Sequence, residues 1–208
     1  MKITKFILNI IGLSNLRFSW EYPRGSIQAV KKHFGDKKLI GAEVGCWKGV
    51  NALSILKTLN LKKLYLIDPY KPYKDYDRSL QVHKRFDSLG IGKGFYDSNP
   101  QKVMNEAKRQ CQENVKGFDC VEFMEKTSFE AVEYLPELDF VYIDGNHEYE
   151  YIKKDIELYW NKIKKGGILS GHDIDSLEFP GIRKAVIEFV VYNNLDLYIN
   201  VNDWWIIK

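Results

Sequence analysis

Two short segments place histidine and aspartate directly after apolar runs. In "DFVYIDGNHEYE" the apolar run ends at Asp144 and His147 follows, and in "GGILSGHDID" a second run ends at His172 and Asp173. Carboxylates and imidazoles can accept protons near neutral pH and can bind divalent ions. A hydrogen-bonded surface turn would explain one such residue, but the pattern occurs twice. The repetition favours a functional site over two structural turns.

The elements that must position these residues follow from the hydrophobic pattern. Strand-like segments, "KLIGAEVG", "KKLYLIDPY", "DCVEFME", "LDFVYID" and "GILSGHD", alternate with helix-like segments, and "DLYINVNDWWIIK" is typical of a closing hairpin. Continuous apolar strands alternating with helices indicate a parallel sheet that is covered on both faces. We expect an α/β fold, a three-layer sandwich with a Rossmann-like, mostly parallel seven-stranded sheet and an antiparallel hairpin at its C-terminal end.

The helix that follows Asp144 has an apolar stripe that includes Ile152, Ile156 and Ile163, and we expect it to end at Gly166 and Gly167.

Ligands of such sheets bind beyond the carboxyl ends of the strands. Glu43 and Gly45 follow the first expected strand and Asp68 follows the second, at the same edge as Asp144 and Asp173. These residues are therefore expected to line one site.

The segment "EVGCWKG" predicts a tight turn between a strand and a helix. Gly45 and Gly49 would let the backbone approach a ligand, and the next helix would offer free N–H groups. The spacing differs from the G-x-G-x-x-G of dinucleotide-binding folds and from a P-loop. Asp68, which follows the next strand, could accept hydrogen bonds from both hydroxyls of a ribose. A turn without a ligand, with Asp68 as a simple cap, is the alternative.

The chain resembles the class I S-adenosylmethionine-dependent methyltransferases in "GAEVGCWKG", "LIDPY", "YIDGNHEYEYIKKDIELYWNKIKKGGILSGHDI" and "NDWWIIK". It is most similar to their branch of small O-methyltransferases with I-D-G-x-H and G-H-D motifs. The similarity extends over residues 26–208. It implies that Glu43, Gly45 and Gly49 lie along the methionine part of S-adenosylmethionine, that Asp68 holds the ribose and that Ser128 lies near the adenine.

The resemblance also implies roles for the residues at the next two strand ends. Asp144 would face the sulfonium and the acceptor, and a divalent metal would be held by Asp144 and Asp173, with His172 either as a third ligand or as a support behind the ligands. The histidine departs from the oxygen ligands of several metal-dependent relatives and suits manganese, iron or zinc better than magnesium. Methyl transfer to a hydroxyl requires removal of its proton. His147, with an ordinary pKa of about 6.5, is the expected general base, with Asp144 beside it.

We therefore expect an S-adenosylmethionine-dependent methyltransferase that acts on a sugar-like or small-molecule hydroxyl. A nicotinamide-dependent oxidoreductase and a non-catalytic cofactor-binding module of the same fold are the alternatives. With 45% hydrophobic residues and a net charge of +3, composition gives no case for nucleic acid as a partner. Three cysteines without metal-type spacing predict a reducing, cytoplasmic location.

Two segments have expected roles of their own. Residues 1–25 are expected to form an N-terminal extension that includes an amphipathic helix packed on the domain or on a partner, with membrane-surface contact as the alternative. The remaining residues, 26–208, would form one domain. Within it, residues 70–99 combine aromatic and basic side chains and would cover the acceptor site as a lid, with an ordinary surface loop and short helix as the alternative.

Overall fold

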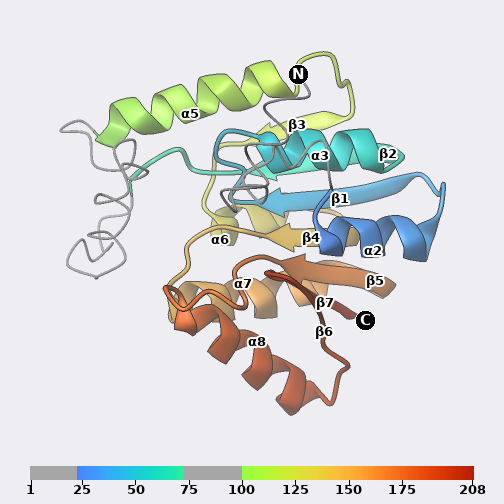
Figure 1. Ribbon diagram of the computed structural model, residues 1–208. Helices are drawn as coiled ribbons and strands as arrows, with labels where there is room; N and C mark the ends of the chain where they lie inside the picture. Colours follow the sequence, from blue (N-terminus) through green and yellow to red (C-terminus); the bar gives the residue numbers. More distant parts are fainter. Residues whose placement is uncertain (1–22, 73–99) are drawn as a thin grey trace, which may run out of the picture.

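The computed structural model describes residues 23–72 and 100–208, which form a sheet with helices on both of its faces (Figure 1). The expected N-terminal helix and most of the expected lid lie outside these residues. Within the described ranges, no helix combines the length and the apolar character that crossing a membrane requires.

The central sheet has the expected mostly parallel topology. Within the described residues its seven strands lie in the order β3-β2-β1-β4-β5-β7-β6. The first five pair in parallel, and β7 runs antiparallel to both β5 and β6. The strands are β1 (Leu39–Val44), β2 (Leu61–Ile67), β3 (Val121–Met124), β4 (Leu138–Ile143), β5 (Ile163–Gly171), β6 (Tyr198–Asn200) and β7 (Asp203–Ile207). The expected α/β fold with a C-terminal antiparallel hairpin is confirmed.

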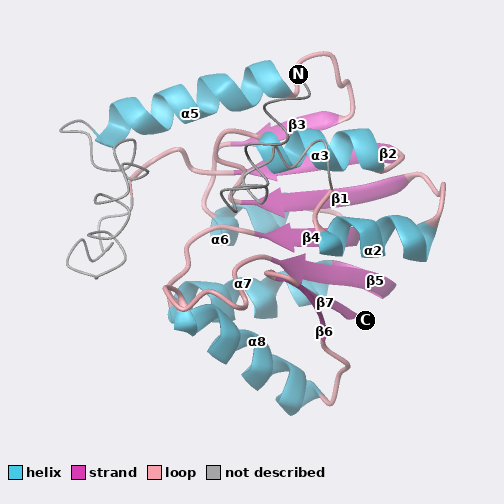
Figure 2. Ribbon diagram, viewed as in Figure 1, coloured by secondary structure: helices cyan, strands magenta, loops and turns pink. Residues whose placement is uncertain are grey.

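Helices cover both faces of this sheet (Figure 2). One face carries α2 (Gly25–Phe34), α3 (Val50–Thr58) and α5 (Pro100–Asn114), and the other carries α6 (Ser128–Ala131), the 3-10 turn η3 (Val132–Tyr134), α7 (Tyr149–Lys162) and α8 (Pro180–Asn193). The three layers follow from this arrangement.

The alternation of side chains along β4 explains why both faces are covered. Phe140 and Tyr142 pack with the helices α2, α3 and α5, whereas Val141 and Ile143 pack with α7 and α8. Successive side chains of a strand point to opposite faces, so a strand that is apolar throughout must be buried on both sides. All four side chains are at most 1% exposed. The central strand is therefore fixed in register where it delivers Asp144 to the sheet edge.

The end of α7 differs from the expectation. The helix ends at Lys162 rather than at Gly166 and Gly167, and β5 begins directly at Ile163. Ile163 has extended backbone angles (φ −72°, ψ 132°) and is 2% exposed as part of the sheet. Ile163 continues the apolar spacing of α7 because its side chain packs into the same core as the buried face of the helix.

Candidate active site

The expected site residues lie where the order of the strands reverses. β1 and β4 are neighbours in the sheet. From β1 the chain continues to β2 on one side, and from β4 it continues to β5 on the other side. Such a reversal opens a crevice beyond the carboxyl ends of the strands. The loop residues at this edge remain anchored, because Asp144 N–H donates to Val44 O at 2.8 Å and Gly45 N–H donates to Ile67 O at 2.8 Å.

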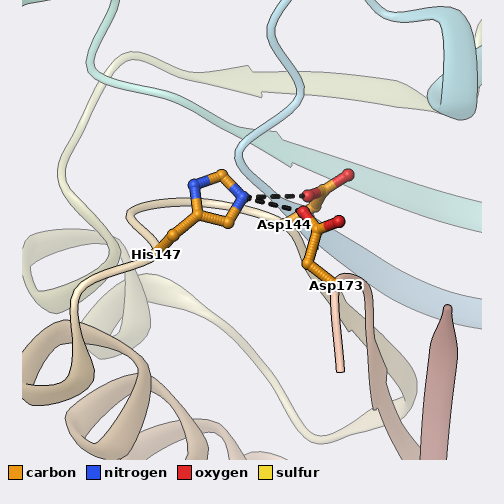
Figure 3. Close-up of side chains that lie close together, drawn as sticks. All are labelled: Asp144, His147 and Asp173. Atoms are coloured by element: carbon orange, nitrogen blue, oxygen red, sulfur yellow. Dashed lines mark ion pairs between the residues drawn. The ribbon is translucent and has the colours of Figure 1, made fainter. Parts of the chain in front are cut away.

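Asp144, His147 and Asp173 come together at this edge (Figure 3). Nε2 of His147 lies 3.1 Å from Oδ2 of Asp173 and 3.7 Å from Oδ1 of Asp144. One ligand atom from each residue lies within 4.8 Å of the others, a spacing that a single metal ion could bridge. The three side chains are about one-fifth exposed, so the cluster is partly shielded from water but open to a ligand.

His172 lies in the supporting position, one of the two roles expected of it. Its Nδ1 lies 3.0 Å from Oδ1 of Asp173, and its Nε2 lies 3.8 Å from Oδ1 of Asp203. The imidazole in the group of potential ligands is that of His147. The structure thus places His172 behind Asp173, as a support of this carboxylate, and the role of either histidine as a ligand stays a prediction.

Neighbouring side chains hold the cluster in its orientation. Asp173 has a left-handed backbone conformation (φ 60°), and its Oδ1 accepts a hydrogen bond of 2.7 Å from Nδ2 of Asn202. The ring of His147 stacks on Phe179, with centroids 4.3 Å apart and planes 19° apart. Two contacts thus fix Asp173 and His147 from outside the cluster, which is the support that a functional site needs.

The charges in the cluster change the protonation of its members. Burial lowers the pKa of His147, but its interactions with Asp144 and Asp173 outweigh this effect and raise the pKa from 6.5 to about 9. Burial raises the pKa of Asp144 and Asp173, yet nearby positive groups bring both below their ordinary values. Without a bound cation, His147 is therefore protonated at neutral pH, unlike the ordinary histidine assumed from the sequence.

Arg24 is a member of the site that the sequence pattern did not reveal. One guanidinium nitrogen, Nη1, lies 3.1 Å from Oδ2 of Asp144 and also donates a hydrogen bond to the hydroxyl of Tyr142. Burial lowers the pKa of Arg24, but Tyr142 and the carboxylates of Asp144 and Asp203 outweigh this effect and raise it. The nearest signal in the sequence is the loop "EYPRG" before α2, which shows nothing of a contact with a residue 120 positions away.

Asp68 connects the end of β2 to the glycine-containing loop. Its Oδ2 accepts a hydrogen bond from the N–H of Trp47 at 2.9 Å, and its Oδ1 accepts one from the N–H of Tyr70 at 2.8 Å. Burial raises the pKa of Asp68 more than these hydrogen bonds lower it. Each carboxylate oxygen has a second lone pair, so Asp68 can still accept hydrogen bonds from two ribose hydroxyls.

Glu43 has a buried oxygen that a ligand or a water could satisfy. The side chain is 1% exposed, and its Oε1 accepts a hydrogen bond of 2.9 Å from Nδ2 of Asn51. Oε2 has no hydrogen-bond partner among the described residues. Burial raises the pKa of Glu43 to about 8. A buried, unpaired oxygen is costly unless something binds it, which fits a place beside a polar cofactor.

Gly45 and Gly49 are glycines for steric reasons. Both have positive φ angles, 84° and 71°. A Cβ on Gly45 would lie 2.2 Å from the carbonyl oxygen of Asp144, and a Cβ on Gly49 would lie 2.7 Å from Sγ of Cys111. The loop after β1 thus packs directly on Asp144, the first residue after β4.

Ser128 lies at the first position of α6, after β3. The N-cap is Thr127, which forms a capping box with Glu130. The carbonyl oxygen of Ser128 accepts a hydrogen bond of 3.0 Å from the hydroxyl of Tyr159. The side chain is half-buried at the same edge of the sheet, and its role in holding adenine stays a prediction.

A family comparison identifies the class of protein that this fold and site define. The family model described as "Methyltransferase domain" matches residues 42–174, from β1 to the residue after Asp173. The chain belongs to this family and is an S-adenosylmethionine-dependent methyltransferase of class I. The oxidoreductase and the non-catalytic module are not favoured. Among curated protein sequences, none matches this chain.

Solved structures with the same fold include three methyltransferases. The O-methyltransferase NovP has a TM-score of 0.60 and 16% identity over 88% of this chain and 79% of that chain. CalS11, a calicheamicin methyltransferase whose apo structure is described as a TDP-rhamnose 3'-O-methyltransferase, has a TM-score of 0.61 and 15% identity over 88% and 77%. A putative caffeoyl-CoA O-methyltransferase from Staphylococcus aureus has a TM-score of 0.59 and 11% identity over 97% and 90%.

Proposed function

We propose that this methyltransferase transfers the methyl group of S-adenosylmethionine to a hydroxyl of a small, sugar-like acceptor. The observation that carries the proposal is the convergence of Asp144, His147 and Asp173 within 4.8 Å at the switch point of the sheet. Carboxylates and an imidazole are the groups that can deprotonate and orient a hydroxyl, which is a poor nucleophile until its proton is removed.

The residues on the β1 and β2 side would hold the cofactor. Asp68 would accept hydrogen bonds from the ribose, Glu43 would use its unpaired Oε2 near the methionine part, and Gly45 and Gly49 would let the backbone come close. Ser128 would contact the adenine. The bound cofactor supplies an electrophilic methyl group on a sulfonium. The protein then contributes mainly by placing the acceptor oxygen in line, and orientation of this kind can account for roughly 7–11 kcal/mol of the barrier.

Asp144 and His147 would serve the acceptor. His147 can take the hydroxyl proton only when its ring is neutral, and the two neighbouring carboxylates oppose this by raising its pKa to about 9. Two carboxylates and an imidazole within 4.8 Å fit a divalent ion such as manganese, iron or zinc. A divalent ion held by Asp144 and Asp173, with His172 as a further ligand or a support, would supply positive charge that lowers the pKa of the hydroxyl and of His147, which could then accept the proton. We therefore propose that the site works with such an ion.

The choice of a hydroxyl acceptor rests on the neighbours of similar fold. NovP is an O-methyltransferase, and CalS11 is described as acting on TDP-rhamnose. Both are less than 20% identical to this chain, so they support the class of acceptor rather than a particular compound. A deoxysugar nucleotide is a reasonable first probe for this reason.

The proposal is tested in two steps. Isothermal titration with S-adenosylhomocysteine should give saturable binding, and its absence at millimolar ligand would remove the cofactor site. Methyl transfer from labelled S-adenosylmethionine to a panel of nucleotide sugars and phenols, with and without Mn²⁺, should then identify an acceptor. The Asp144→Asn variant is the control, because it should bind the cofactor but not turn over. Full turnover by this variant would show that the acceptor site lies elsewhere.

A further inference from the structure

Both oxygens of Asp144 face a positively charged side chain. Nε2 of His147 lies 3.7 Å from Oδ1, and Nη1 of Arg24 lies 3.1 Å from Oδ2. The Arg24 side chain is 25% exposed and that of Asp144 is 20% exposed, so water screens this pair only in part. The electrostatic effect of Arg24 on the site is therefore larger than that of a surface ion pair.

Arg24 is held in this position by a network of its own. Its Nη1 also donates to the hydroxyl of Tyr142, which in turn donates to Oδ1 of Asp203 at 3.2 Å. Oδ2 of Asp203 accepts hydrogen bonds from the backbone N–H of Ser26 at 3.0 Å and from its hydroxyl at 2.6 Å. The guanidinium carbon of Arg24 lies 5.5 Å from the centre of the Tyr142 ring. The first turn of α2 is thus tied to β4 and β7, and Arg24 reaches Asp144 from a fixed backbone.

We infer that Arg24 is a positioning residue whose guanidinium is a resident cation of the active site. It occupies Oδ2 of Asp144, turns Oδ1 towards His147, and competes with a divalent ion for the negative charge of this carboxylate. The inference rests on the proposed role of Asp144 in the site. It adds that Arg24, the N-cap of α2, supports the active site through Asp144 and that its positive charge sets how strongly the site binds metal.

The test is a titration of the chelator-treated full-length chain with Mn²⁺ at constant pH, with free Mn²⁺ measured by electron paramagnetic resonance. Arg24→Gln removes the charge but keeps an N–H that can donate to Asp144, and it should bind Mn²⁺ about tenfold more tightly than the wild type, because a unit charge next to the site is gone. Arg24→Lys keeps the charge and should bind Mn²⁺ as the wild type does. Arg24→Met is a second neutral variant in case the glutamine variant does not fold.

A structural control separates charge from loss of packing. Ser26→Ala removes the hydroxyl bond to Asp203, keeps the backbone N–H bond and retains the charge of Arg24. It should lower the melting temperature but change the Mn²⁺ affinity clearly less than Arg24→Gln does. Equal or weaker Mn²⁺ binding by Arg24→Gln, or an equal gain by Arg24→Lys, would overturn the inference.

The same titration tells a failed inference from a failed metal site. The double variant Arg24→Gln/Asp144→Asn should bind Mn²⁺ no more tightly than the single variant Asp144→Asn. If the gain remains, the ion binds away from Asp144, and it is the proposed metal site that is wrong.

Discussion

His147 and Asp173 form an ion pair across the ends of two neighbouring parallel strands, with Nε2 of the ring 3.1 Å from Oδ2 of the carboxylate. His147 lies in the loop that leaves β4, and Asp173 lies in the loop that leaves β5. The pair therefore links the two loops between which the acceptor would bind. Its strength depends on the charge of the imidazole, which makes the link sensitive to pH.

The first prediction concerns stability against pH. The pKa of His147 is raised from 6.5 to about 9 in the folded protein. A raised pKa means that the folded state binds the proton more tightly, so the stabilisation is complete below pH 6.5 and is lost as the pH rises through about 9. A shift of this size in a partly exposed group corresponds to roughly 2–3 kcal/mol. Urea unfolding of chelator-treated protein between pH 6 and 10 measures it.

His147→Gln is the matched variant for this experiment. It should be less stable than the wild type at pH 6 and should lose less stability on going to pH 10. An unchanged pH dependence in the variant would mean that another group is responsible for the effect. Addition of Zn²⁺ to the wild type should also reduce the dependence, because a bound cation replaces the proton.

The second prediction concerns Glu43. Burial raises its pKa to about 8, so the folded protein holds this carboxyl neutral at pH 7, whereas the unfolded chain ionises it above about 4.5. The wild type should thus lose stability as the pH rises from 4.5 to 8. Glu43→Gln removes this titration and should be more stable than the wild type at pH 9. If the variant is instead less stable at every pH, the carboxyl is ionised and paired in the folded protein.

The third prediction concerns the contact between the glycine-containing loop and Asp144. Gly45→Ala places a Cβ 2.2 Å from the carbonyl oxygen of Asp144 at a φ of 84°, so the backbone must move. Gly117→Ala is the control, since it has a similar φ of 89° but nothing within 4 Å of the added Cβ. The control should cost about 1–2 kcal/mol of unfolding free energy from backbone strain alone. Gly45→Ala should cost clearly more and should also weaken S-adenosylhomocysteine binding; equal costs would show that the loop is not tightly packed.

The fourth prediction concerns Asp68. Asp68→Ala removes the acceptor for the N–H groups of Trp47 and Tyr70 and for the expected ribose hydroxyls. Loss of such hydrogen bonds should weaken S-adenosylhomocysteine binding by about 10- to 100-fold in isothermal titration. Asp36→Asn, at a carboxylate whose side chain is 94% exposed, should bind as the wild type does. An Asp68→Ala variant of unchanged affinity would place the ribose elsewhere.

Much of the fold could be predicted because its signals are local. The apolar run from Phe140 to Ile143 is typical of a strand covered on both sides, and the loops that follow parallel strands all lie at one edge of the sheet. This reasoning places Asp144, His147 and Asp173 at the same edge from the amino-acid sequence alone. The same reasoning fails at Ile163, which has the spacing of the helix stripe but is the first residue of β5.

The finer chemistry of the site depends on contacts between distant residues. No periodicity in the sequence relates Arg24 to Asp144, and no spacing indicates whether His147 or His172 faces the two carboxylates. The raised pKa of His147 is likewise a property of the folded cluster, because it depends on Asp144 and Asp173 both lying next to the ring. Sequence patterns thus predict which edge of the sheet carries the site and which residue types line it, but not their pairing.

The hydrogen bonds between Ser26 and Asp203 join residues that are 177 positions apart. During synthesis on the ribosome, Asp203 becomes available only 177 residues after Ser26. Until then the start of α2 has no anchor on β7, and the guanidinium beside Asp144 has no fixed support. The strands β1 to β5 can therefore pair before this anchor exists, but the support of Arg24 is complete only when β7 has emerged.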